Sequence, residues 1–361
     1  MGKLSGITVI DLSQFLPGPM LSVMMADQGA EVIKIEPPAG DPARVMAPFE
    51  QGQSVWFRNL NRGKLSEALD LKSDAGRARL TELIRTADVF VEGFRPGVMA
   101  RLGFDYAAVS ALNPRIVYCS VSAFGQSGPL AHHPAHDLAV QALSGFLSVN
   151  DGPDGNPVVP GVPSADMAAG LTGLSAVLMA LIGRERTGKG DYVDIAMFDS
   201  LLPWCAHIAG TAIAGGKAPR SETQRSLGGA GFYQVYATSD GRHIALGGRE
   251  IKFVKVLLTA LNREDLIPLG EADAGPDQAP LIAFLRDTFA TRSRDEWVAW
   301  FEDKDVAFSP VLDFAEALAS EHVRAAGLLV QAGNAHHIAP AIRFAGEPEW
   351  QPVEAPELER G

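Results

Sequence analysis

Cysteine is almost absent from this 361-residue sequence, which contains only Cys119 and Cys205. Domains held together by disulfides carry more cysteines, and zinc sites need paired ligands at close spacing. Both cysteines stand inside apolar runs, IVYCSV and LLPWCAHI. We therefore expect small buried thiols in a reducing compartment, and we expect no bound metal.

Positive charge is also scarce. The chain has 31 Lys and Arg residues against 43 Asp and Glu residues, which gives a formal net charge of −12. An acidic chain does not bind nucleic acid through its bulk charge, so we expect no nucleic-acid partner. An anionic ligand would have to bind at local groups of Arg and Lys or at helix N-termini.

Long hydrophobic segments are missing as well. The longest apolar run, residues 171–183, has 13 residues, whereas a membrane-spanning helix needs about 20. The N-terminal stretch MGKLSGITVIDLS lacks the apolar core of a signal peptide. These features predict a cytoplasmic protein with no membrane contact, in which this run belongs to a core helix over residues 167–183.

A dinucleotide-binding fingerprint is also missing, because Gly18 and Gly29 do not fit the pattern G-x-G-x-x-G. The first 125 residues nevertheless alternate between β-branched runs and helical stretches. Predicted strands at residues 7–13, 31–36 and 88–94 are separated by helical patterns. This alternation is typical of an α/β fold with a Rossmann-like open parallel sheet.

Changes in composition indicate the domain organisation. Residues 1–205 are expected to form the large domain, and residues 206–224, rich in small and polar side chains, an interdomain crossing. A hairpin pattern around Ser239-Asp240-Gly241 and amphipathic helices predict a smaller α+β domain over residues 225–315. Residues 316–361 form a C-terminal segment that we expect to return to the large domain.

Three residues are candidates for catalysis. Asp166 opens an apolar helix after a loop rich in Gly and Pro, where it could be a first-turn acid, a base or a nucleophile. His136 precedes Asp137, a residue type that can cap or orient, and it could equally be a loop histidine. Glu250 follows a pair of glycines and could be a solvent-facing residue at a helix start.

Basic residues follow several predicted strands. Ligands of open parallel sheets bind beyond the carboxyl ends of the strands. Lys72, Arg95 and Arg101 stand near such ends and would suit phosphate groups, although exposed basic residues are also common on ordinary surfaces.

Several motifs together resemble one family. They include LSGITVIDLSQFLPGP, GAEVIKIEPPAGDPAR, VFVEGFRPGVMARLG, AHDLAVQALSG, RERTGKGDYVDIAMFDS and YATSDGRHIALGG. The chain resembles the family III CoA-transferase and α-methylacyl-CoA racemase superfamily over nearly its whole length. The resemblance implies an acyl-CoA substrate, a Rossmann-like large domain, a smaller second domain and an intertwined homodimer. Coenzyme A would enter as part of the substrate, with no other cofactor.

The resemblance implies two chemistries. In the racemase-like branch, which His136-Asp137 and the chain length favour, His136 and Asp166 move the α-proton of a 2-methylacyl-CoA thioester. Glu250 would orient His136 or balance its charge. Backbone N–H groups near Asp166 would stabilise the enolate. In the alternative, a CoA-transferase moves CoA between carboxylic acids with Asp166 as covalent nucleophile. A third interpretation is an acyl-CoA-binding protein without catalysis.

The resemblance also implies a set of coenzyme A contacts. The residues expected to contribute are Arg44, Leu69, Lys72, Phe94, Arg95 and Arg101. The sequence departs from the racemase pattern at Pro37, where that pattern favours Arg, and Arg44 is the candidate to replace it. It also departs at Ala135, where the pattern has Gly before the histidine.

Overall fold

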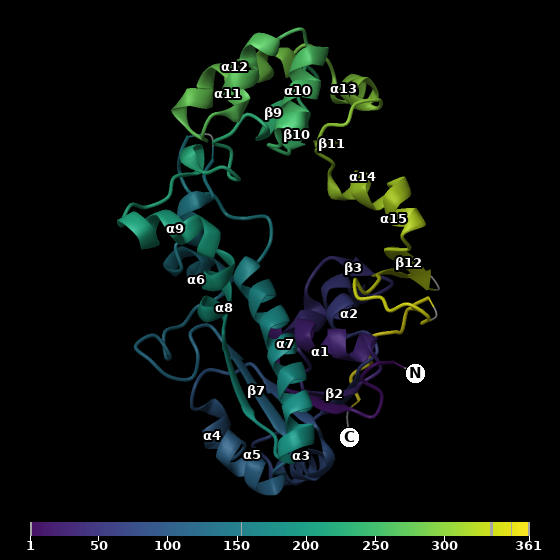
Figure 1. Cartoon of the computed structure of the whole chain (residues 1–361). Coiled ribbons are helices and arrows are strands. Elements are labelled where there is room, and N and C mark those ends of the chain that lie inside the picture. Colours follow the sequence, from purple (N-terminus) through teal and green to yellow (C-terminus); the bar gives the residue numbers. More distant parts are fainter. Residues whose placement is uncertain (1, 153, 333–334, 348, 360–361) are drawn as a thin grey trace. The chain divides into compact units, whose positions relative to one another are not determined.

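The computed structural model describes residues 2–152, 154–332, 335–347 and 349–359. The chain divides into two compact units, which are described separately (Figure 1). Unit 1 comprises Met1–Ser144, Pro160–Trp204 and Glu321–Gly361, and unit 2 comprises Gly145–Val159 and Cys205–Ser320.

A parallel sheet forms the centre of unit 1. Its strands are β1 (Thr8–Asp11), β2 (Glu31–Glu36), β5 (Leu65–Ala68), β6 (Val89–Glu92), β7 (Val117–Ser122) and β8 (Tyr192–Ala196). Among the described residues the order is β5-β2-β1-β6-β7-β8, and every neighbouring pair is parallel. The chain therefore winds outward from β1 in one direction and then from β6 in the other. This is the Rossmann-type order, and the predicted α/β fold class is confirmed.

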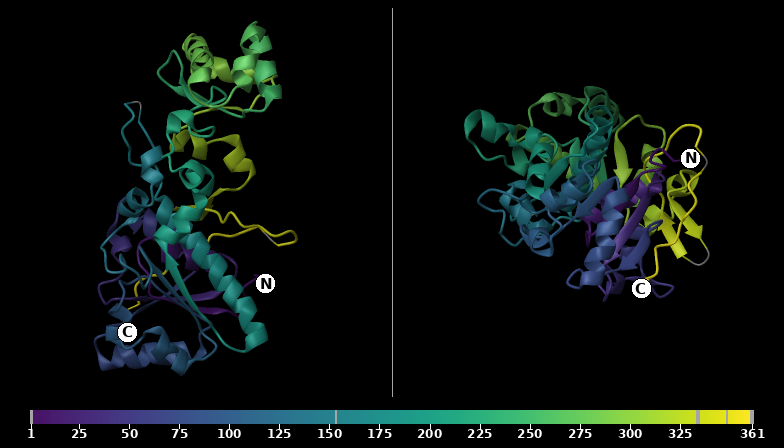
Figure 2. Two further views of the ribbon diagram at one scale, coloured as in Figure 1. Left: turned by 60° about the vertical axis from the view of Figure 1, so that its left-hand side comes forward. Right: turned by 90° about the horizontal axis from the view of Figure 1, so that it is seen from below.

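Helices cover both faces of this sheet (Figure 2). On one face, α3 (Asp74–Thr86), α4 (Val98–Leu102) and α5 (Tyr106–Leu112) bury apolar side chains against the strands. On the other, α1 (Pro17–Asp27) packs against α7 (Ser164–Thr187). This contact depends on glycine, since a Cβ added to Gly173 would lie 2.8 Å from Leu21 Cδ1. Because strands buried on both faces need apolar side chains throughout, their β-branched runs are visible in the sequence.

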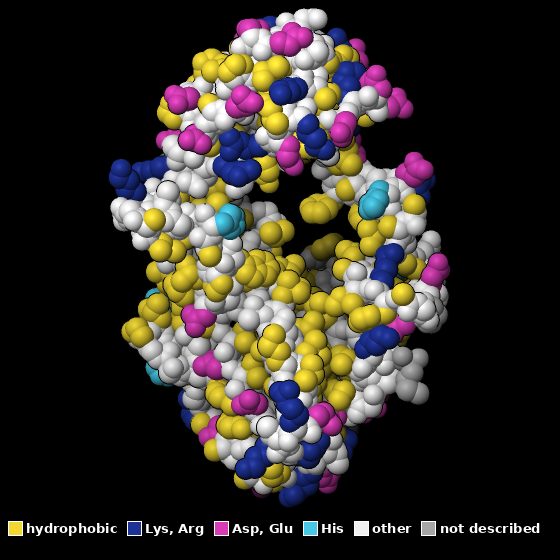
Figure 3. Space-filling model, in the orientation of Figure 1, with side chains coloured by type: hydrophobic (Ala, Val, Ile, Leu, Met, Phe, Trp, Pro, Cys, Tyr) yellow, Lys and Arg dark blue, Asp and Glu magenta, His cyan; other side chains and the backbone are white. Residues whose placement is uncertain are grey.

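Helix α7 is longer than its apolar run suggested. It has 24 residues, and its most apolar window has a mean hydropathy of 1.7, so by length and composition alone it could cross a membrane. It packs against α1, α6, β7, β8 and α8 within unit 1. One side of it is uncovered: Met179 is 70% and Ile182 is 66% exposed. Figure 3 shows hydrophobic side chains gathered over this part of unit 1.

Shorter elements complete unit 1. They are η1 (Pro42–Val45), β3 (Phe49–Glu50), β4 (Gln53–Ser54), α2 (Val55–Asn61), α6 (Asp137–Leu143), α8 (Met197–Trp204), α15 (Glu321–Ala325), β12 (Leu329–Ala332) and β13 (Ala335–Ile338). The C-terminal segment runs back along the unit. Backbone hydrogen bonds of 3.0 Å join Gly63 to Glu354 and Ala68 to Glu359.

Unit 2 is a small sheet covered by helices. Its elements are η2 (Phe146–Val149), α9 (Ala206–Gly215), η3 (Ser221–Thr223), β9 (Tyr233–Ala237), β10 (His243–Gly247), α10 (Ile251–Ala260), η4 (Glu264–Leu266), α11 (Ile267–Glu271), η5 (Pro276–Gln278), α12 (Ala279–Phe289), α13 (Arg294–Phe301), β11 (Phe308–Pro310) and α14 (Phe314–Leu318). Strands β11-β10-β9 are antiparallel. The core contains Phe289, Trp297 and Phe301, and a capping box at Ser293 begins α13.

One segment lies outside the unit to which the sequence assigned it. Residues 145–159 fall within the range expected for the large domain, yet they group with unit 2. A hydrogen bond of 2.5 Å from Ser221 Oγ to Asp151 Oδ2 holds this excursion to η3. The two residues are 70 positions apart in the chain, so no local pattern could indicate the contact.

Candidate active site

Asp166 lies in the first turn of α7, in unit 1. The helix begins after Pro163, whose backbone is not helical and whose side chain cannot cap. The first N–H groups of α7 therefore need acceptors from elsewhere in the fold, because a helix leaves its first four N–H groups unpaired.

Asp137, the first residue of α6, supplies the acceptor. Its Oδ1 accepts hydrogen bonds from the backbone N–H groups of Ala165 at 2.8 Å and Asp166 at 3.1 Å. Its Oδ2 accepts from the side chain of Gln141, one turn further along α6. An enolate oxygen at these two N–H groups would have to compete with Asp137, and the expected stabilisation of an enolate by backbone N–H groups near Asp166 stays a prediction.

The Asp166 carboxyl has an abnormal acidity. Burial raises its pKa, and the nearby Asp137 carboxylate raises it further, to about 7. Among the described residues no cation or hydrogen-bond donor lowers it. A carboxyl that retains its proton until neutral pH is a stronger base and a stronger nucleophile than an ordinary aspartate, and such groups are concentrated at functional sites.

His136 is the N-cap residue of α6 and is exposed. Its side chain makes no capping hydrogen bond, so its ring is free of a structural role at the helix start. The ring lies edge-on to Phe15, with the centroids 6.4 Å apart and an interplanar angle of 87°. His136 directly precedes Asp137 in the chain, so it stands next to the residue whose carboxylate caps α7.

Glu250 lies in unit 2, where it is the N-cap residue of α10 and is exposed. Its side chain makes no capping hydrogen bond. The proposed contact between Glu250 and His136 joins residues of different units, and it stays a prediction.

Five of the six residues expected to contact coenzyme A follow strand ends of the large sheet. Leu69 and the exposed Lys72 come after β5, and Phe94 and the exposed Arg95 come after β6. Arg101 is exposed on α4, which follows the same loop. The carboxyl ends of parallel strands meet at one edge, so we expect Leu69, Lys72, Phe94 and Arg95 to lie near the edge at which such sheets bind ligands. Their contacts with coenzyme A stay a prediction, as does that of Arg101.

Arg44, the sixth residue, already forms an ion pair with Glu36. Its Nε and Nη2 donate to the two carboxylate oxygens of Glu36 at 2.7 Å and 2.6 Å. Nη1 donates to the carbonyl of Pro356 at 2.9 Å, and the guanidinium stacks over Phe57 at 4.0 Å. A phosphate would have to compete with Glu36 for this guanidinium.

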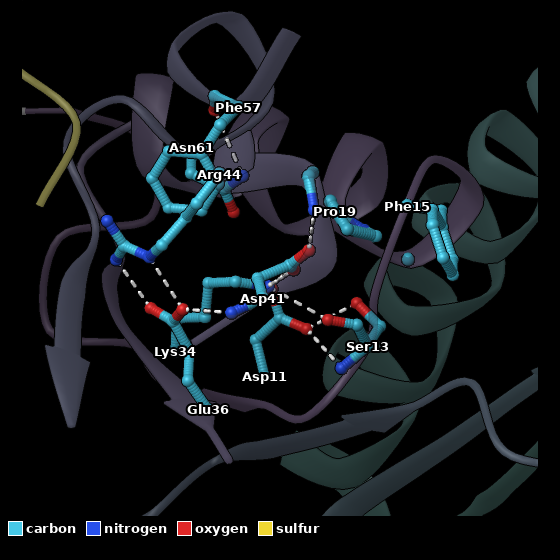
Figure 4. A network of polar contacts seen from close by, with 12 residues as sticks. Asp11, Ser13, Phe15, Pro19, Lys34, Glu36, Asp41, Arg44, Phe57 and Asn61 are labelled. Atoms are coloured by element: carbon cyan, nitrogen blue, oxygen red, sulfur yellow. Dashed lines mark hydrogen bonds and ion pairs between the residues drawn. The ribbon is translucent and has the colours of Figure 1, made fainter. Parts of the chain in front are cut away.

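Sequence reasoning missed a buried ionic network at the carboxyl ends of β1 and β2 (Figure 4). Lys64 Nζ pairs with Asp11 Oδ2 at 3.1 Å, and Lys34 Nζ pairs with Asp41 Oδ2 at 2.7 Å. Lys34 Nζ also donates to the carbonyl of Ser13 at 2.9 Å. The available signal was a charged residue inside each apolar strand, Asp11 in TVIDLS and Lys34 in EVIKIE.

No metal site was expected. Within residues 2–152, 154–332, 335–347 and 349–359, no group of three or more His, Cys, Asp and Glu side chains is placed to hold a metal ion.

Comparison with known proteins identifies the family. The model of CoA-transferase family III matches residues 4–360. The chain is 36% identical over 366 residues to acetyl-CoA:oxalate CoA-transferase of Acetobacter aceti, covering 99% of this chain and 93% of that one. It is 34% identical over 331 residues to alpha-methylacyl-CoA racemase of Homo sapiens, covering 91% and 82%.

A solved structure is similar along the same length. The crystal structure of a CAIB/BAIF family protein from Brucella suis superposes with a TM-score of 0.87 at 30% identity, covering 99% of this chain and 96% of that one. The fold, the motifs and these relatives agree: the chain belongs to CoA-transferase family III.

Proposed function

We propose that this protein is a CoA-transferase that moves coenzyme A between carboxylic acids, with Asp166 as the nucleophile. The observation that carries the proposal is the carboxyl of Asp166 at the start of α7, with its pKa raised to about 7 by burial and by Asp137. Transferases among the relatives, including the one of Acetobacter aceti, support it. The sequence alone favoured the racemase chemistry, and the relatives favour this alternative.

The proposed chemistry begins with the charged form of Asp166. Its carboxylate oxygen attacks the thioester carbonyl carbon, the C–S bond breaks, and coenzyme A leaves as the thiolate. An acyl anhydride with Asp166 remains. The thiolate of coenzyme A attacks the Asp166 carbonyl of the anhydride, which releases the first carboxylic acid and leaves a thioester on Asp166. The second carboxylate attacks this thioester and displaces the thiolate, which gives a new anhydride. The thiolate then attacks the acyl carbonyl of the new anhydride, which yields the new acyl-CoA and restores Asp166, so that no net oxidant, reductant or water is consumed.

Coenzyme A would bind across the carboxyl edge of the sheet in unit 1. Leu69 and Phe94 are partly buried there, and Lys72, Arg95 and Arg101 are exposed cations that suit phosphate oxygens. Arg44 is expected to act indirectly, by fixing the loop after β2 through Glu36.

The decisive variants are Asp166→Ala and the control Asp74→Ala. Asp74 occupies the first turn of α3 and its side chain is 98% exposed, so it matches Asp166 in helix position but not in burial. Asp166→Ala should lower CoA transfer from an acyl-CoA to a free carboxylate by at least ~10³-fold, because the bond-forming atom is gone. Wild-type transfer should rise as the pH passes through about 7, since only the carboxylate attacks. Transfer that survives in Asp166→Ala would refute the proposal.

An acyl-CoA racemase is the second candidate, favoured by one observation. His136 stands beside the residue that caps α7, so two proton-transferring groups lie on adjoining segments. Incubating the protein with 2-methylacyl-CoA thioesters in D2O, without any free acid, tests this chemistry. Deuterium at Cα that disappears in His136→Ala would establish racemisation. Absence of deuterium at Cα in wild type, with CoA transfer once a free carboxylic acid is added, would exclude it.

We also propose that the protein is a homodimer. Helix α9 is apolar, yet no residue of it is buried among those described, and Ile213 is 78% exposed. Uncovered apolar surface of this kind is typical of an interface. Light scattering should give twice the chain mass, and Ile213→Asp should shift the protein toward monomer. A monomeric wild type at micromolar concentration would refute the dimer.

A further inference from the structure

Phe15 has a backbone conformation that its side chain disfavours. Its φ of 64° lies in the left-handed region, which bulky residues rarely adopt. Two other described residues that are not glycine share this property, Gln51 in the β3–β4 turn and Asn262 after α10. Those positions are a tight turn and a helix end, where left-handed residues are ordinary. Phe15 stands instead between β1 and α1, at the candidate site.

The turn before Phe15 is fixed by buried charges (Figure 4). The N–H of Ser13 donates to Asp11 Oδ1 at 2.9 Å, and the carbonyl of Ser13 accepts from Lys34 Nζ at 2.9 Å. A Cβ added to Gly18 would lie 2.2 Å from Ser13 Cβ, so α1 can approach the turn only with glycine there. The backbone two residues before Phe15 therefore has no freedom to relax the strain.

Hydrogen bonds and buried ion pairs also fix the backbone at Phe15 itself. The carbonyl of Phe15 accepts a hydrogen bond of 3.4 Å from Trp56 Nε1 on α2. Asp11 and Lys34 are fully buried and held in ion pairs, so moving this turn would break hydrogen bonds to charged groups that water cannot reach. A strained residue that is held this firmly points to a function for its side chain.

The ring of Phe15 faces the candidate site. It is 41% exposed, and it lies edge-on to the ring of His136, with the ring centroids 6.4 Å apart. A Cβ added to Gly93, which follows β6, would lie 3.6 Å from Ser13 Cβ. The turn therefore lies where β1 and β6 exit side by side and the strand order reverses, which is where open sheets bind ligands.

Asp166 lies close to the same turn. Helix α7 meets α1 one turn after Asp166, where a Cβ on Gly170 would lie 3.1 Å from the carbonyl oxygen of Pro17. Pro17 follows Phe15 by two residues. The strained ring, His136 and the α7 N-terminus thus come together on unit 1, from three separate segments of the chain.

We propose that Phe15 is a specificity-determining residue, an apolar wall that limits the bulk of the acyl group next to the thioester carbonyl. This inference rests on the proposed function, because it needs an acyl thioester at Asp166. The fixed ring admits short acyl groups that are unbranched at the α-carbon and excludes bulkier ones. Fixing the backbone in a strained conformation makes the wall rigid, and a rigid wall discriminates better than a mobile one.

The test replaces the ring and leaves the turn intact. In Phe15→Gly, glycine accepts the left-handed φ without strain, and Phe15→Leu keeps most of the bulk. We expect Phe15→Gly to raise kcat/KM for a 2-methyl-branched acyl-CoA relative to acetyl-CoA by at least ~10-fold, the effect of one or two methyl groups in an apolar pocket. Phe15→Leu should change this ratio less than ~3-fold. The matched control is Phe344→Gly on the C-terminal segment, where the ring is 42% exposed and the ratio should stay constant.

A binding measurement separates this inference from the proposed function. Calorimetry with acetyl-CoA, the branched thioester and free coenzyme A gives selectivity even without turnover. If Phe15→Gly binds the branched thioester more tightly than wild type does, and the affinities for the other two ligands are unchanged, Phe15 limits the acyl group. This result would hold even if wild type transfers no CoA and the proposed function fails. The proposed role of Phe15 would be refuted if Phe15→Gly changes the affinity for all three ligands equally, or if the ratio of branched to acetyl thioester is unchanged in both the kinetic and the binding assay. The proposed transfer by Asp166 would not be affected by either result.

Discussion

Two aspartates of unit 1, Asp11 and Asp166, have opposite environments. Asp11 is fully buried, and burial alone would raise its pKa. The charges of Lys64 and Lys34 and hydrogen bonds from Ser13 and Ser22 outweigh burial and hold the pKa well below its usual range. Asp166 is partly exposed, has no cation among the described residues that lowers its pKa, and has that pKa raised to about 7 by burial and by Asp137.

The difference shows how the fold uses charge. A carboxylate paired with lysines in the interior is fixed in one protonation state and stabilises one geometry, here the turn that carries Phe15. A carboxylate placed next to another carboxylate is kept near its titration point and remains reactive. The pairing, more than the depth of burial, separates the structural aspartate from the candidate catalytic one.

The largest effect on stability is expected when one cation is removed from the buried network around Asp11. Lys64→Met leaves the charge of Asp11 buried with one partner fewer, which should lower the free energy of unfolding by about 4 kcal/mol. Urea denaturation measures it. The control is Lys252→Met, whose ion pair with Asp305 is exposed and should contribute less than about 0.5 kcal/mol. A loss below about 1 kcal/mol in Lys64→Met would contradict the structural role of the network.

Removing the charge of Asp166 should raise the free energy of unfolding, whereas Lys64→Met should lower it. Its folded-state pKa of about 7 exceeds the ordinary value of 3.8, so the folded protein binds the proton more tightly and loses stability as the pH rises from about 4 to 7. Asp166→Asn should therefore be more stable than wild type at pH 8 by about 2 kcal/mol, roughly half of the full linkage value because the site is partly solvated. The difference should vanish near pH 3. Thermal unfolding across this range measures it, and a pH-independent difference would exclude the raised pKa.

Changing Asp137 should sharpen the comparison by separating its two effects. Asparagine keeps the acceptor for the N–H groups of Ala165 and Asp166 but removes the charge. In Asp137→Asn, the midpoint of the pH–rate profile for transfer should fall by about one pH unit, because burial, the larger cause, remains. Asp137→Ala should also lose about 1 kcal/mol of stability as the helix cap disappears. Identical pH profiles in wild type and Asp137→Asn would refute the electrostatic coupling.

The smallest effect is expected at the edge of the ionic network. Arg44→Lys keeps the charge but loses the two-pronged contact with Glu36 and the stacking on Phe57. Stability should fall by about 1 kcal/mol, since the side chain is only 16% exposed. If affinity for coenzyme A instead falls tenfold with stability unchanged, Arg44 contacts the ligand directly, as its position in the sequence suggested.

Much of the architecture was predictable because it depends on local patterns. The β-branched runs that form β1, β2 and β6 lie within the residue ranges predicted for strands from the sequence. The excursion of residues 145–159 into unit 2 was not predictable, because contacts with distant residues hold it, among them the hydrogen bond from Ser221 to Asp151. The full length of α7 was underestimated, because its first and last turns are polar and only its middle is apolar.

By itself the sequence determined the alternation of strands and helices, the family motifs and the two candidates His136 and Asp166. Only the tertiary structure decided the charge pairs and hydrogen bonds around the polar groups, and with them the pKa of Asp166. Lys64 pairs with Asp11 across 53 positions, and Asp137 caps α7 from 28 and 29 positions away. The reason is physical: a local pattern records which face of an element is buried, whereas a pKa and a strained turn depend on charges that the fold brings together from distant segments.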